Sequence, residues 1–541
     1  MSETSPTGAV ALGLAERLRL RWLARHAQPA VLAALPEPRL LGQYARGRQM
    51  LAGEFLLAGT LLQAHGHVPF SPQPGGVQEE LHGFGWLDHL AAVGDGAARQ
   101  LAQAALVDWI TRFGRGAGAG WAPALVGRRV ARWIVHAAFV LQGMEARVQA
   151  QFLQALALNV AYLEKRAARA AGGLPQIEAQ LGRLYAALSL EGMAGLLPDV
   201  RAALLRAAQT LVGDDGAIAS RNPEELLEVF SHLALAAQVL ADQGETPEPE
   251  LLSLLNICAQ TLRCLRHADG GLARFHGGGR GQEGALATAL ANLARLGGAP
   301  ARAAGTMAMG YARLAAGRST VLIDAAAPPR AGAAARAHAS TLAFEMTSNR
   351  RPLIVSCGDG RDFGPDWHRA SRASASHSTL ALEGYSSSRF ATGRKARLEL
   401  ADGPRAVEVQ LRQLAHARIA SLGHDGYVPS HGLEHLRQLD LSGDGRALLG
   451  EDMLIATSKS ARARFDEVIA RSGGAGVAFA LRFHLHPDAV PVLDGETLAV
   501  YVTLPSGEVW VFRAEGHAPV LAPSVYLEKG RVNPRSSQQI M

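Results

Sequence analysis

The spacing of apolar residues divides this chain into two parts. From about residue 45 to 315, apolar side chains recur every three or four positions, which is the period of amphipathic helices. Helices are expected at 98–113, 126–140, 148–163, 176–193, 198–212, 223–242, 249–266 and 283–296. Breaks rich in Gly and Pro separate these stretches, so this part is predicted to form antiparallel helical hairpins.

From about residue 319 onward, apolar and polar positions alternate, which is typical of β-strands. Strands are expected at 320–324, 341–346, 352–356, 378–383, 406–414, 433–441, 477–486, 498–504 and 509–513. Helices followed by strands indicate two segregated domains and not alternating βαβ units. The predicted division is an N-terminal extension at 1–44, a helical domain at 45–318 and a β domain at 319–541.

Composition narrows the class of protein without identifying a function. Hydrophobic residues make up 48% of the 541 residues and charged residues 19%, as in ordinary globular proteins. The 54 basic and 48 acidic residues leave a net charge of +6, and the basic residues are dispersed along the chain. A polyanionic partner is therefore only weakly favoured, and a nucleic-acid partner is not expected.

Two further features bear on where the protein works. No stretch approaches the length of about 18 apolar residues, so no transmembrane helix is expected. Apolar residues 8–15 precede Arg17, Arg19, Arg21 and Arg25, which is the reverse of the order in a secretory signal. An ordinary first helix is the favoured interpretation of this segment, and a basic helix at a membrane surface is the alternative. By themselves these features indicate the cytoplasm, or export by an unrecognised route.

Histidines and arginines concentrate in three segments that a plain scaffold would not require. Residues 267–278 (HADGGLARFHGG) form a glycine-rich loop between two predicted helices. Residues 336–345 (RAHASTLAFE) and 369–380 (RASRASASHSTL) each lead into a predicted strand. Functional groups are disproportionately found on loops that a rigid scaffold positions. These segments are therefore candidates for a functional site.

The order of several segments along the chain resembles the heparinase II/III-like polysaccharide lyases. In the first part the matching segments are LHGFGWL (81–87), GRRVARWI (127–134) and SRNP (220–223). In the second part they are the His338 and His377 strands and the segments SCG (356–358), GY (426–427), HLR (435–437), GED (450–452) and RFHLHP (482–487). The resemblance covers nearly the whole chain. It implies an incomplete α/α toroid followed by an antiparallel β-sandwich, in a periplasmic or cell-envelope protein.

The chemistry that this resemblance implies is β-elimination on a uronic-acid-containing polysaccharide, such as a glycosaminoglycan. The reaction needs donors that neutralise the sugar carboxylate, a base that removes the C5 proton and an acid that protonates the leaving oxygen. Arg and Asn suit the first role, because both donate hydrogen bonds to carboxylates. The resemblance places the site in a groove between toroid and sandwich.

Carried over residue by residue, the sandwich side keeps part of the family's pattern. Arg336 stands where the family has a catalytic His, and His338 and His377 stand where some members have metal-ligating His residues. The metal-ligating Asp falls near Ser356 and Cys357. Because zinc accepts nitrogen and sulfur ligands, His338, Cys357 and His377 form a candidate zinc site. Hydrogen bonding by both His residues is the simpler alternative, and no cofactor is expected to be required.

The toroid side departs further from the family. The position of the catalytic Tyr falls on Glu225, and that of the Asn-His pair falls near 173–175, which carries no polar side chain. Arg221 and Asn222 are candidates for binding the sugar carboxylate, and Glu225 is a candidate for proton transfer. Asn222 also has a structural alternative, because Asn followed by Pro is typical of a helix N-terminus.

The candidate site therefore consists of two groups of residues. The catalytic candidates are Arg221, Asn222, Glu225, Arg336 and His338. The substrate-binding candidates are Arg274, His276 and His377. Two functions stay open, a lyase that acts on an acidic polysaccharide, or a catalytically impaired lyase scaffold that binds an acidic glycan in cell-envelope biogenesis. The identity of the glycan and the oligomeric state are left open as well.

Overall fold

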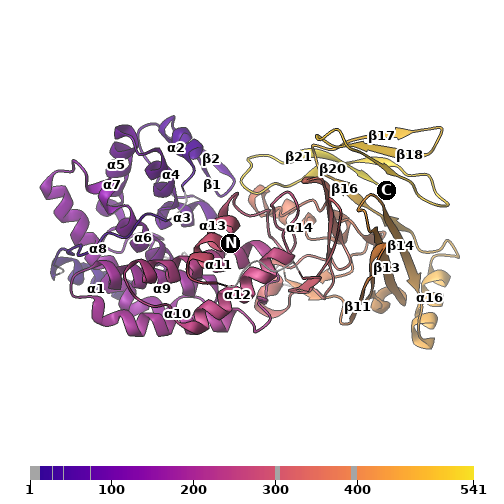
Figure 1. The fold of residues 1–541 in the computed structure, drawn as a ribbon, viewed down its shortest axis with the longest axis horizontal. Helices are drawn as coiled ribbons and strands as arrows, with labels where there is room; N and C mark the ends of the chain where they lie inside the picture. Colours follow the sequence, from indigo (N-terminus) through magenta and orange to yellow (C-terminus); the bar gives the residue numbers. More distant parts are fainter. Residues whose placement is uncertain (1–11, 27, 40–41, 74, 299–304, 392–398) are drawn as a thin grey trace. The chain divides into compact units, whose positions relative to one another are not determined.

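Two compact units make up the part of the chain that the structure describes. This computed structural model describes residues 12–26, 28–39, 42–73, 75–298, 305–391 and 399–541 (Figure 1). The first unit is helical and lies within Met1–Gly213, Glu228–Asn256 and Gly284–Pro300. The second unit contains the larger β-sheets and lies within Asp214–Leu227, Ile257–Glu283 and Ala301–Met541.

Helices fill most of the sequence before residue 300. They are α1 (Leu14–His26), α2 (Tyr44–Leu51), α3 (Gly75–Gly83), α4 (Gly85–Val93), α5 (Gly96–Phe113), α6 (Pro123–Val135), α7 (Ala137–Leu141), α8 (Ala146–Arg166), α9 (Leu174–Ser189), α10 (Leu197–Leu211), α11 (Pro223–Asp242), α12 (Pro249–Cys264) and α13 (Ala285–Arg295). The predicted helices are confirmed, except that the one at 126–140 is divided into α6 and α7 at His136. No described helix combines the length and the apolar character needed to span a bilayer.

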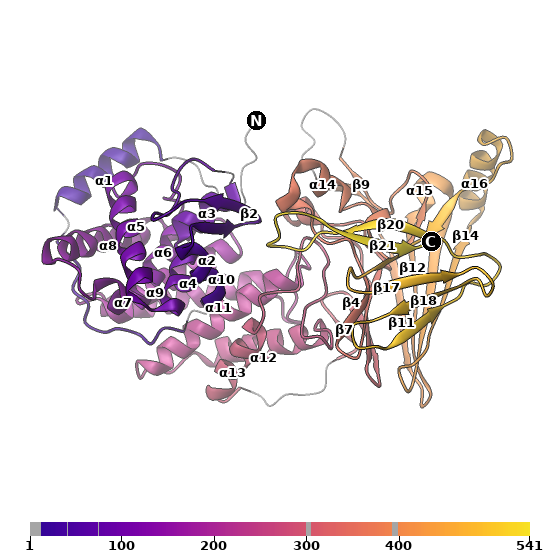
Figure 2. The same cartoon turned by 90° about the horizontal axis from the view of Figure 1, so that it is seen from above.

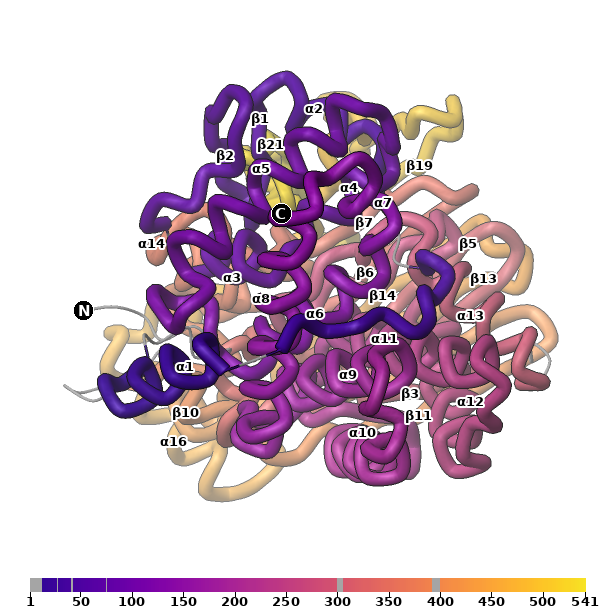
Figure 3. Tube along the Cα trace, turned by 90° about the vertical axis from the view of Figure 1, so that its left-hand side faces the viewer, coloured from indigo at the N-terminus to yellow at the C-terminus, as the bar shows by residue number. Residues whose placement is uncertain are grey.

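The helical part also holds a feature that the periodicity did not predict. A hairpin of two short strands, β1 (Glu54–Leu57) and β2 (Thr60–Gln63), follows α2. Further along, α6 packs on α9 and α9 packs on α10 (Figure 3). Glycines permit the first of these contacts, because a β-carbon at Gly182 would lie 2.5 Å from the Cα atom of Gly127.

Arg129 of α6 is fully buried, and no described carboxylate pairs with it. Its Nε and Nη2 donate to Oδ1 of Asn159 at 3.1 and 2.6 Å, and its Nη1 donates to the carbonyls of His82 and Gly120 at 2.9 Å each. The guanidinium carbon lies 4.1 Å from the centroid of the Trp109 ring. Burial lowers the pKa of Arg129 to about 9. Carbonyls and an aromatic face therefore hold this cation in the core of the helical unit.

The second unit is built from antiparallel sheets. The largest has eight strands in the order β20–β21–β16–β7–β6–β5–β4–β3. These strands are β3 (Met307–Ala308), β4 (Tyr311–Ala316), β5 (Ser319–Asp324), β6 (Phe344–Ser348), β7 (Arg351–Val355), β16 (Phe483–Leu485), β20 (Leu521–Tyr526) and β21 (Arg535–Ile540). Two smaller sheets consist of β11 (Val407–Gln413), β12 (Ala417–Tyr427), β13 (Leu433–Ser442) and β14 (Leu448–Ile455), and of β17 (Val490–Asp494), β18 (Ala499–Thr503) and β19 (Val509–Phe512).

Short elements complete this unit. Two strand pairs are β8 (Leu380–Leu382) with β15 (Phe479–Leu481), and β9 (Arg389–Phe390) with β10 (Leu400–Asp402). The helices are α14 (Pro365–Ala370), α15 (Val428–His431), α16 (Lys459–Arg471) and the 3₁₀ turns η3 (Ala331–Arg336), η4 (Arg361–Phe363) and η5 (Ser374–Ser376).

Strand alternation builds the core of the sandwich. One face of the eight-stranded sheet packs against the four-stranded and three-stranded sheets (Figure 2). The buried residues of this core include Leu314, Val321, Ile323, Phe344 and Met346 from the large sheet and Leu422, Leu439, Leu441, Val500 and Val502 from the other two. The predicted antiparallel β-sandwich is confirmed.

The opposite face of the eight-stranded sheet is buried and carries polar side chains. Because side chains alternate along a strand, Asp324 of β5 and Glu345 of β6 point away from the apolar core. Segments from the helical part of the sequence cover this face. Arg221 pairs with Asp324, and the backbone N–H of Arg274 donates to Glu345 at 3.1 Å. These segments belong to the second unit, although they precede its strands by many residues.

Two differences from the predicted strands have local causes. Strand β12 was not predicted, because Gly423 and several small or polar residues interrupt its alternation. It nevertheless lies between β11 and β13, which supply hydrogen bonds along its length. The predicted strand at 477–486 is two strands, β15 and β16, which belong to different sheets.

Candidate functional site

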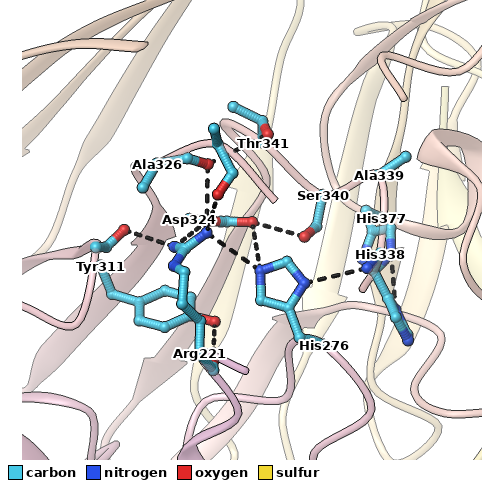
Figure 4. Close-up of polar contacts among 12 residues, drawn as sticks. Arg221, His276, Tyr311, Asp324, Ala326, His338, Ala339, Ser340, Thr341 and His377 are labelled. Atoms are coloured by element: carbon cyan, nitrogen blue, oxygen red, sulfur yellow. Dashed lines mark hydrogen bonds and ion pairs between the residues drawn. The ribbon is translucent and has the colours of Figure 1, made fainter. Parts of the chain in front are cut away.

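Arg221 stands at the centre of a buried polar network in the second unit (Figure 4). It precedes α11 with a positive φ of 50°. Nε donates to the carbonyl of Met309 at 3.1 Å, and Nη2 donates to the Gly310 carbonyl and to Oδ1 of Asp324 at 2.8 and 2.5 Å. Nη1 donates to the carbonyls of Ala327 and Ala326 at 2.9 and 3.3 Å. A guanidinium has five N–H donors, so all of them are in use.

Asp324 is the carboxylate of this network and is completely buried. In addition to Arg221, it accepts a hydrogen bond from Oγ of Ser340 at 2.6 Å. Burial by itself would raise the pKa of Asp324, but Arg221 and His276 outweigh burial and hold this pKa well below its usual range. The carboxylate is therefore ionised at neutral pH.

His276 connects Asp324 to the strand-entry segment that holds His338. Its Nδ1 accepts the backbone N–H of His338 at 3.1 Å, so in a neutral imidazole the proton resides on Nε2. That nitrogen lies 3.4 Å from Oδ2 of Asp324 and points its proton at the carboxylate. Burial lowers the pKa of His276, although Asp324 opposes this effect. Both ring nitrogens of His276 are therefore engaged in the folded protein.

His338, His377 and Ser356 form a chain of side-chain contacts. Figure 4 shows His338 and His377 beside His276. Nδ1 of His338 lies 3.2 Å from Nε2 of His377, whose Nδ1 lies 2.9 Å from Oγ of Ser356. Burial lowers the pKa of His377 to about 3 and that of His338 well below its usual value, so both rings are neutral. Nε2 of His338 is buried and has no hydrogen-bond partner among the described residues.

The geometry of this unit can now be compared with known proteins. Residues 299–541 match the family model described as heparinase II/III-like, C-terminal. This C-terminal part of the chain therefore belongs to the heparinase II/III-like family. The chain is similar to the FtsZ-localized protein C of Caulobacter vibrioides, to which it is 29% identical over 524 residues, with 93% of this chain and 86% of that protein covered.

Solved structures confirm the fold of the chain. The crystal structure of heparinase III has a TM-score of 0.67 and 14% sequence identity, with 97% of this chain and 86% of that chain covered. A mutant heparan sulfate lyase from Pedobacter heparinus has a TM-score of 0.58 and 14% identity, with 99% and 85% covered. At this identity the likeness shows the fold, an α/α toroid followed by a β-sandwich.

Arg274 belongs to a second buried network in the same unit. Its guanidinium lies 3.8 Å from Glu345 and 3.9 Å from Asp269. Glu345 also contacts Nε2 of His267 at 3.2 Å. Burial raises the pKa of Glu345, and the nearby Arg274 and His267 lower it further than burial raises it. The Arg274 side chain is 6% exposed, so its charge is used within the fold.

The toroid-side candidates differ in how the fold uses them. Oδ1 of Asn222 accepts the backbone N–H groups of Glu224 and Glu225 at 3.0 and 3.2 Å, which makes Asn222 the N-cap of α11. Glu225 is half-buried, and no described residue forms a hydrogen bond or ion pair with its carboxylate. Arg336 ends η3 and is half-buried.

The residues do not fit the zinc site that the resemblance suggested. Sγ of Cys357 lies 3.5 Å from Nδ1 of His484 and 3.9 Å from Oγ of Ser524. His338 and His377 contact each other and Ser356. Within the described ranges, no group of three or more His, Cys, Asp or Glu side chains is placed to hold a metal ion.

Two residues beside this network were missed by the sequence analysis. A β-carbon at Gly277 would lie 3.1 Å from Nη2 of Arg361 and 3.6 Å from both Oδ2 of Asp359 and Cβ of Arg336. Arg361 and Asp359 form an ion pair at 3.5 Å, yet these two atoms make no hydrogen bond within the described chain. Little in the sequence indicated that Asp359 and Arg361 belong to a site, because residues 358–360 are typical of a turn. Asp359 and Arg361 therefore belong to the candidate site.

Proposed function

We propose that this protein is a polysaccharide lyase that cleaves a uronic-acid-containing acidic polysaccharide by β-elimination. One observation carries the proposal. Among the residues that the structure describes, Nε2 of His338 is a buried nitrogen without a hydrogen-bond partner, at the end of the chain of contacts through His377 and Ser356. The lyase fold of the family supports the same conclusion.

The proposed step uses neutral His338 as the base. When Nδ1 of His338 carries the ring proton and donates it to His377, Nε2 has a free lone pair. Nε2 takes the C5 proton of the uronic acid, the C5–H electrons form the C4–C5 double bond, and the C4–oxygen bond breaks. Glu225, whose carboxylate has no described partner, protonates the leaving oxygen.

To neutralise the sugar carboxylate, a cation needs an N–H group that is not already used in a hydrogen bond within the protein. The five donors of Arg221 are already used within the protein. Nη2 of Arg361 makes no hydrogen bond within the described part of the chain, and it lies next to the loop that follows His276. In this proposal Arg361 therefore takes the role that the sequence analysis gave to Arg221.

The test is the ultraviolet absorbance of the unsaturated uronate product over a panel of acidic polysaccharides. We expect turnover by the wild type, a loss of about 100-fold or more in His338→Ala, and a raised KM in Arg361→Gln. His136→Ala removes a buried His from the helical unit, where it contacts Asp88 at 2.9 Å, and is expected to keep turnover. Absence of product on every polysaccharide, or full activity of His338→Ala, would contradict the proposal.

A second candidate function is a lyase scaffold that binds an acidic glycan without cleaving it, in cell-envelope biogenesis. The saturated donors of Arg221 and the capping role of Asn222 favour it, because both residues are committed to the fold. The name of the Caulobacter relative describes a localisation and not an activity, which favours this candidate as well. Measurable affinity for an acidic polysaccharide, without turnover and unchanged in His338→Ala, would select this candidate.

A further inference from the structure

Helix α1 presents a stripe of large apolar side chains to solvent. Leu14, Leu18 and Trp22 are exposed to 74%, 55% and 59%, and their spacing of four residues places them on one helix face. The opposite face packs against α8 of the same unit through Leu20, which is 2% exposed. The three exposed side chains are therefore not needed to hold α1 on the helical unit.

Basic side chains accompany this stripe. Arg19, Arg21 and Arg25 are exposed. At 100° per residue, Arg21 and Arg25 fall on the same side of α1 as the apolar stripe, and Arg19 lies about 60° beyond Trp22. Glu16 is the acidic residue of α1, and it forms an ion pair with Arg166 of α8. The exposed side of α1 therefore carries both apolar and positively charged side chains. Figures 2 and 3 show α1 on the outside of the helical unit.

We propose that α1 binds the surface of an anionic lipid bilayer, lying in the plane of the interface. Leu and Trp side chains enter the boundary between headgroups and acyl chains, and Arg side chains contact the lipid phosphates. With 13 residues, α1 is too short to cross a bilayer, and its net positive charge selects anionic lipid. The proposal is independent of the glycan chemistry, because none of these residues belongs to the candidate site.

Charge distinguishes α1 from another exposed apolar surface of the molecule. Val490 and Val492 of β17 are exposed to 60% and 59%, comparable to Leu18 and Trp22. Strand β17 itself carries an aspartate and neither Lys nor Arg. An anionic bilayer therefore fits α1 better than β17, and β17 offers a matched control.

The experiment is flotation of the purified full-length protein with lipid vesicles. We expect binding to vesicles that mix phosphatidylcholine with phosphatidylglycerol, weaker binding as salt is added, and little binding to phosphatidylcholine alone. The double variant Leu18→Glu/Trp22→Glu is expected to lose binding by about tenfold or more. The triple variant Arg19→Gln/Arg21→Gln/Arg25→Gln is expected to lose the preference for phosphatidylglycerol. The control Val490→Glu/Val492→Glu is expected to bind like the wild type.

Equal binding of the wild type to both vesicle types would overturn the proposal, as would wild-type binding by the α1 double variant or an equal loss in the β17 control. A lipid-free dimer that becomes a monomer in the α1 double variant would identify a second copy of the chain as the occupant, which also overturns it. Circular dichroism and the unfolding midpoint check that each variant folds, and exposed positions such as these tolerate substitution.

Discussion

At the scale of single residues, the pair of Arg221 and Asp324 holds together segments that lie far apart in the sequence. The two residues are separated by 103 positions, and both are largely or fully removed from solvent. A buried ion pair is not by itself strong evidence of stabilisation, but removing one partner leaves an unpaired charge. Asp324 also orients His276 and Ser340, so its loss affects several neighbours at once.

We therefore expect Asp324→Asn to lower the free energy of unfolding by about 3–5 kcal/mol. The measurement is urea denaturation followed by circular dichroism. Asp402→Asn removes the partner of Arg389 at the surface, where both side chains are more than a third exposed, and is expected to cost less than about 1 kcal/mol. Equal effects of the two substitutions would show that the buried network is not needed for stability.

The buried imidazoles make stability depend on pH in a defined window. The pKa of His377 is about 3 in the folded protein, compared with about 6.5 in an unfolded chain. Below about pH 6.5 the unfolded state binds a proton that the folded state excludes, so stability is fully present above this pH and falls as the pH decreases toward 3.

From this linkage we expect His377→Gln to reduce the pH dependence of unfolding by about 1.4 kcal/mol per pH unit between about pH 6 and 4. Urea midpoints at several pH values in this window provide the measurement. His517→Gln, in a loop near the C-terminal strands where the residue is exposed, is a control expected to leave the slope unchanged. The same slope in His377→Gln and the wild type would mean that this ring is protonated in the folded state.

At the scale of elements, α11 shows a residue that can serve both the fold and the site. Its bounds, Pro223–Asp242, agree with the predicted helix, because Asn222, Pro223 and the acidic pair after them are typical of a helix start. Asn222 acts as the cap through Oδ1, and its amide nitrogen takes no part in the cap.

Two substitutions of Asn222 separate the cap from a contact with substrate. We expect Asn222→Ala to destabilise the protein by about 1 kcal/mol, whereas Asn222→Ser keeps the cap and most of the stability. If Asn222 also binds a sugar carboxylate, Asn222→Ser raises KM in the product assay without a change in the unfolding midpoint. Identical loss of stability in both variants would contradict the capping role.

Strands were harder to predict than helices, for a physical reason that β12 illustrates. A helix satisfies its backbone hydrogen bonds internally, so spacing and caps in one segment are enough to locate it. β12 obtains its hydrogen bonds from β11 and β13, and these partners tolerate Gly423 within the strand. The residue pattern of β12 alone therefore gave little indication of a strand, although the patterns of β11 and β13 were sufficient to predict those two strands.

At the scale of the whole molecule, the second unit does not follow the order of the sequence. It combines the β-strands with segments 214–227 and 257–283, which supply Arg221, Arg274 and His276. It also contains β3 and β4, which precede residue 319. The polar face of the large sheet is thus covered by parts of the chain that a division at residue 319 would remove.

We expect a fragment of residues 319–541 to be unable to fold cooperatively. It lacks β4, which pairs with β5, and it leaves Asp324 and Glu345 without Arg221 and Arg274. Urea denaturation and limited proteolysis of the fragment, with the full-length protein as control, provide the measurement. A cooperative unfolding transition of the isolated fragment would show that residues 319–541 form an independent domain.

The sequence by itself determined the two kinds of secondary structure, the family, and most of the residues of the buried network. Arg221, His276, His338 and His377 were singled out from composition and resemblance, because unusual polar residues in loops are visible without a structure. Only the tertiary structure decided which of their donor and acceptor atoms already have hydrogen-bond partners within the protein. Carbonyls and one carboxylate from distant segments accept the hydrogen bonds of Arg221, whereas no described residue bonds to Nε2 of His338. These partners are neighbours in space that a sequence pattern does not specify.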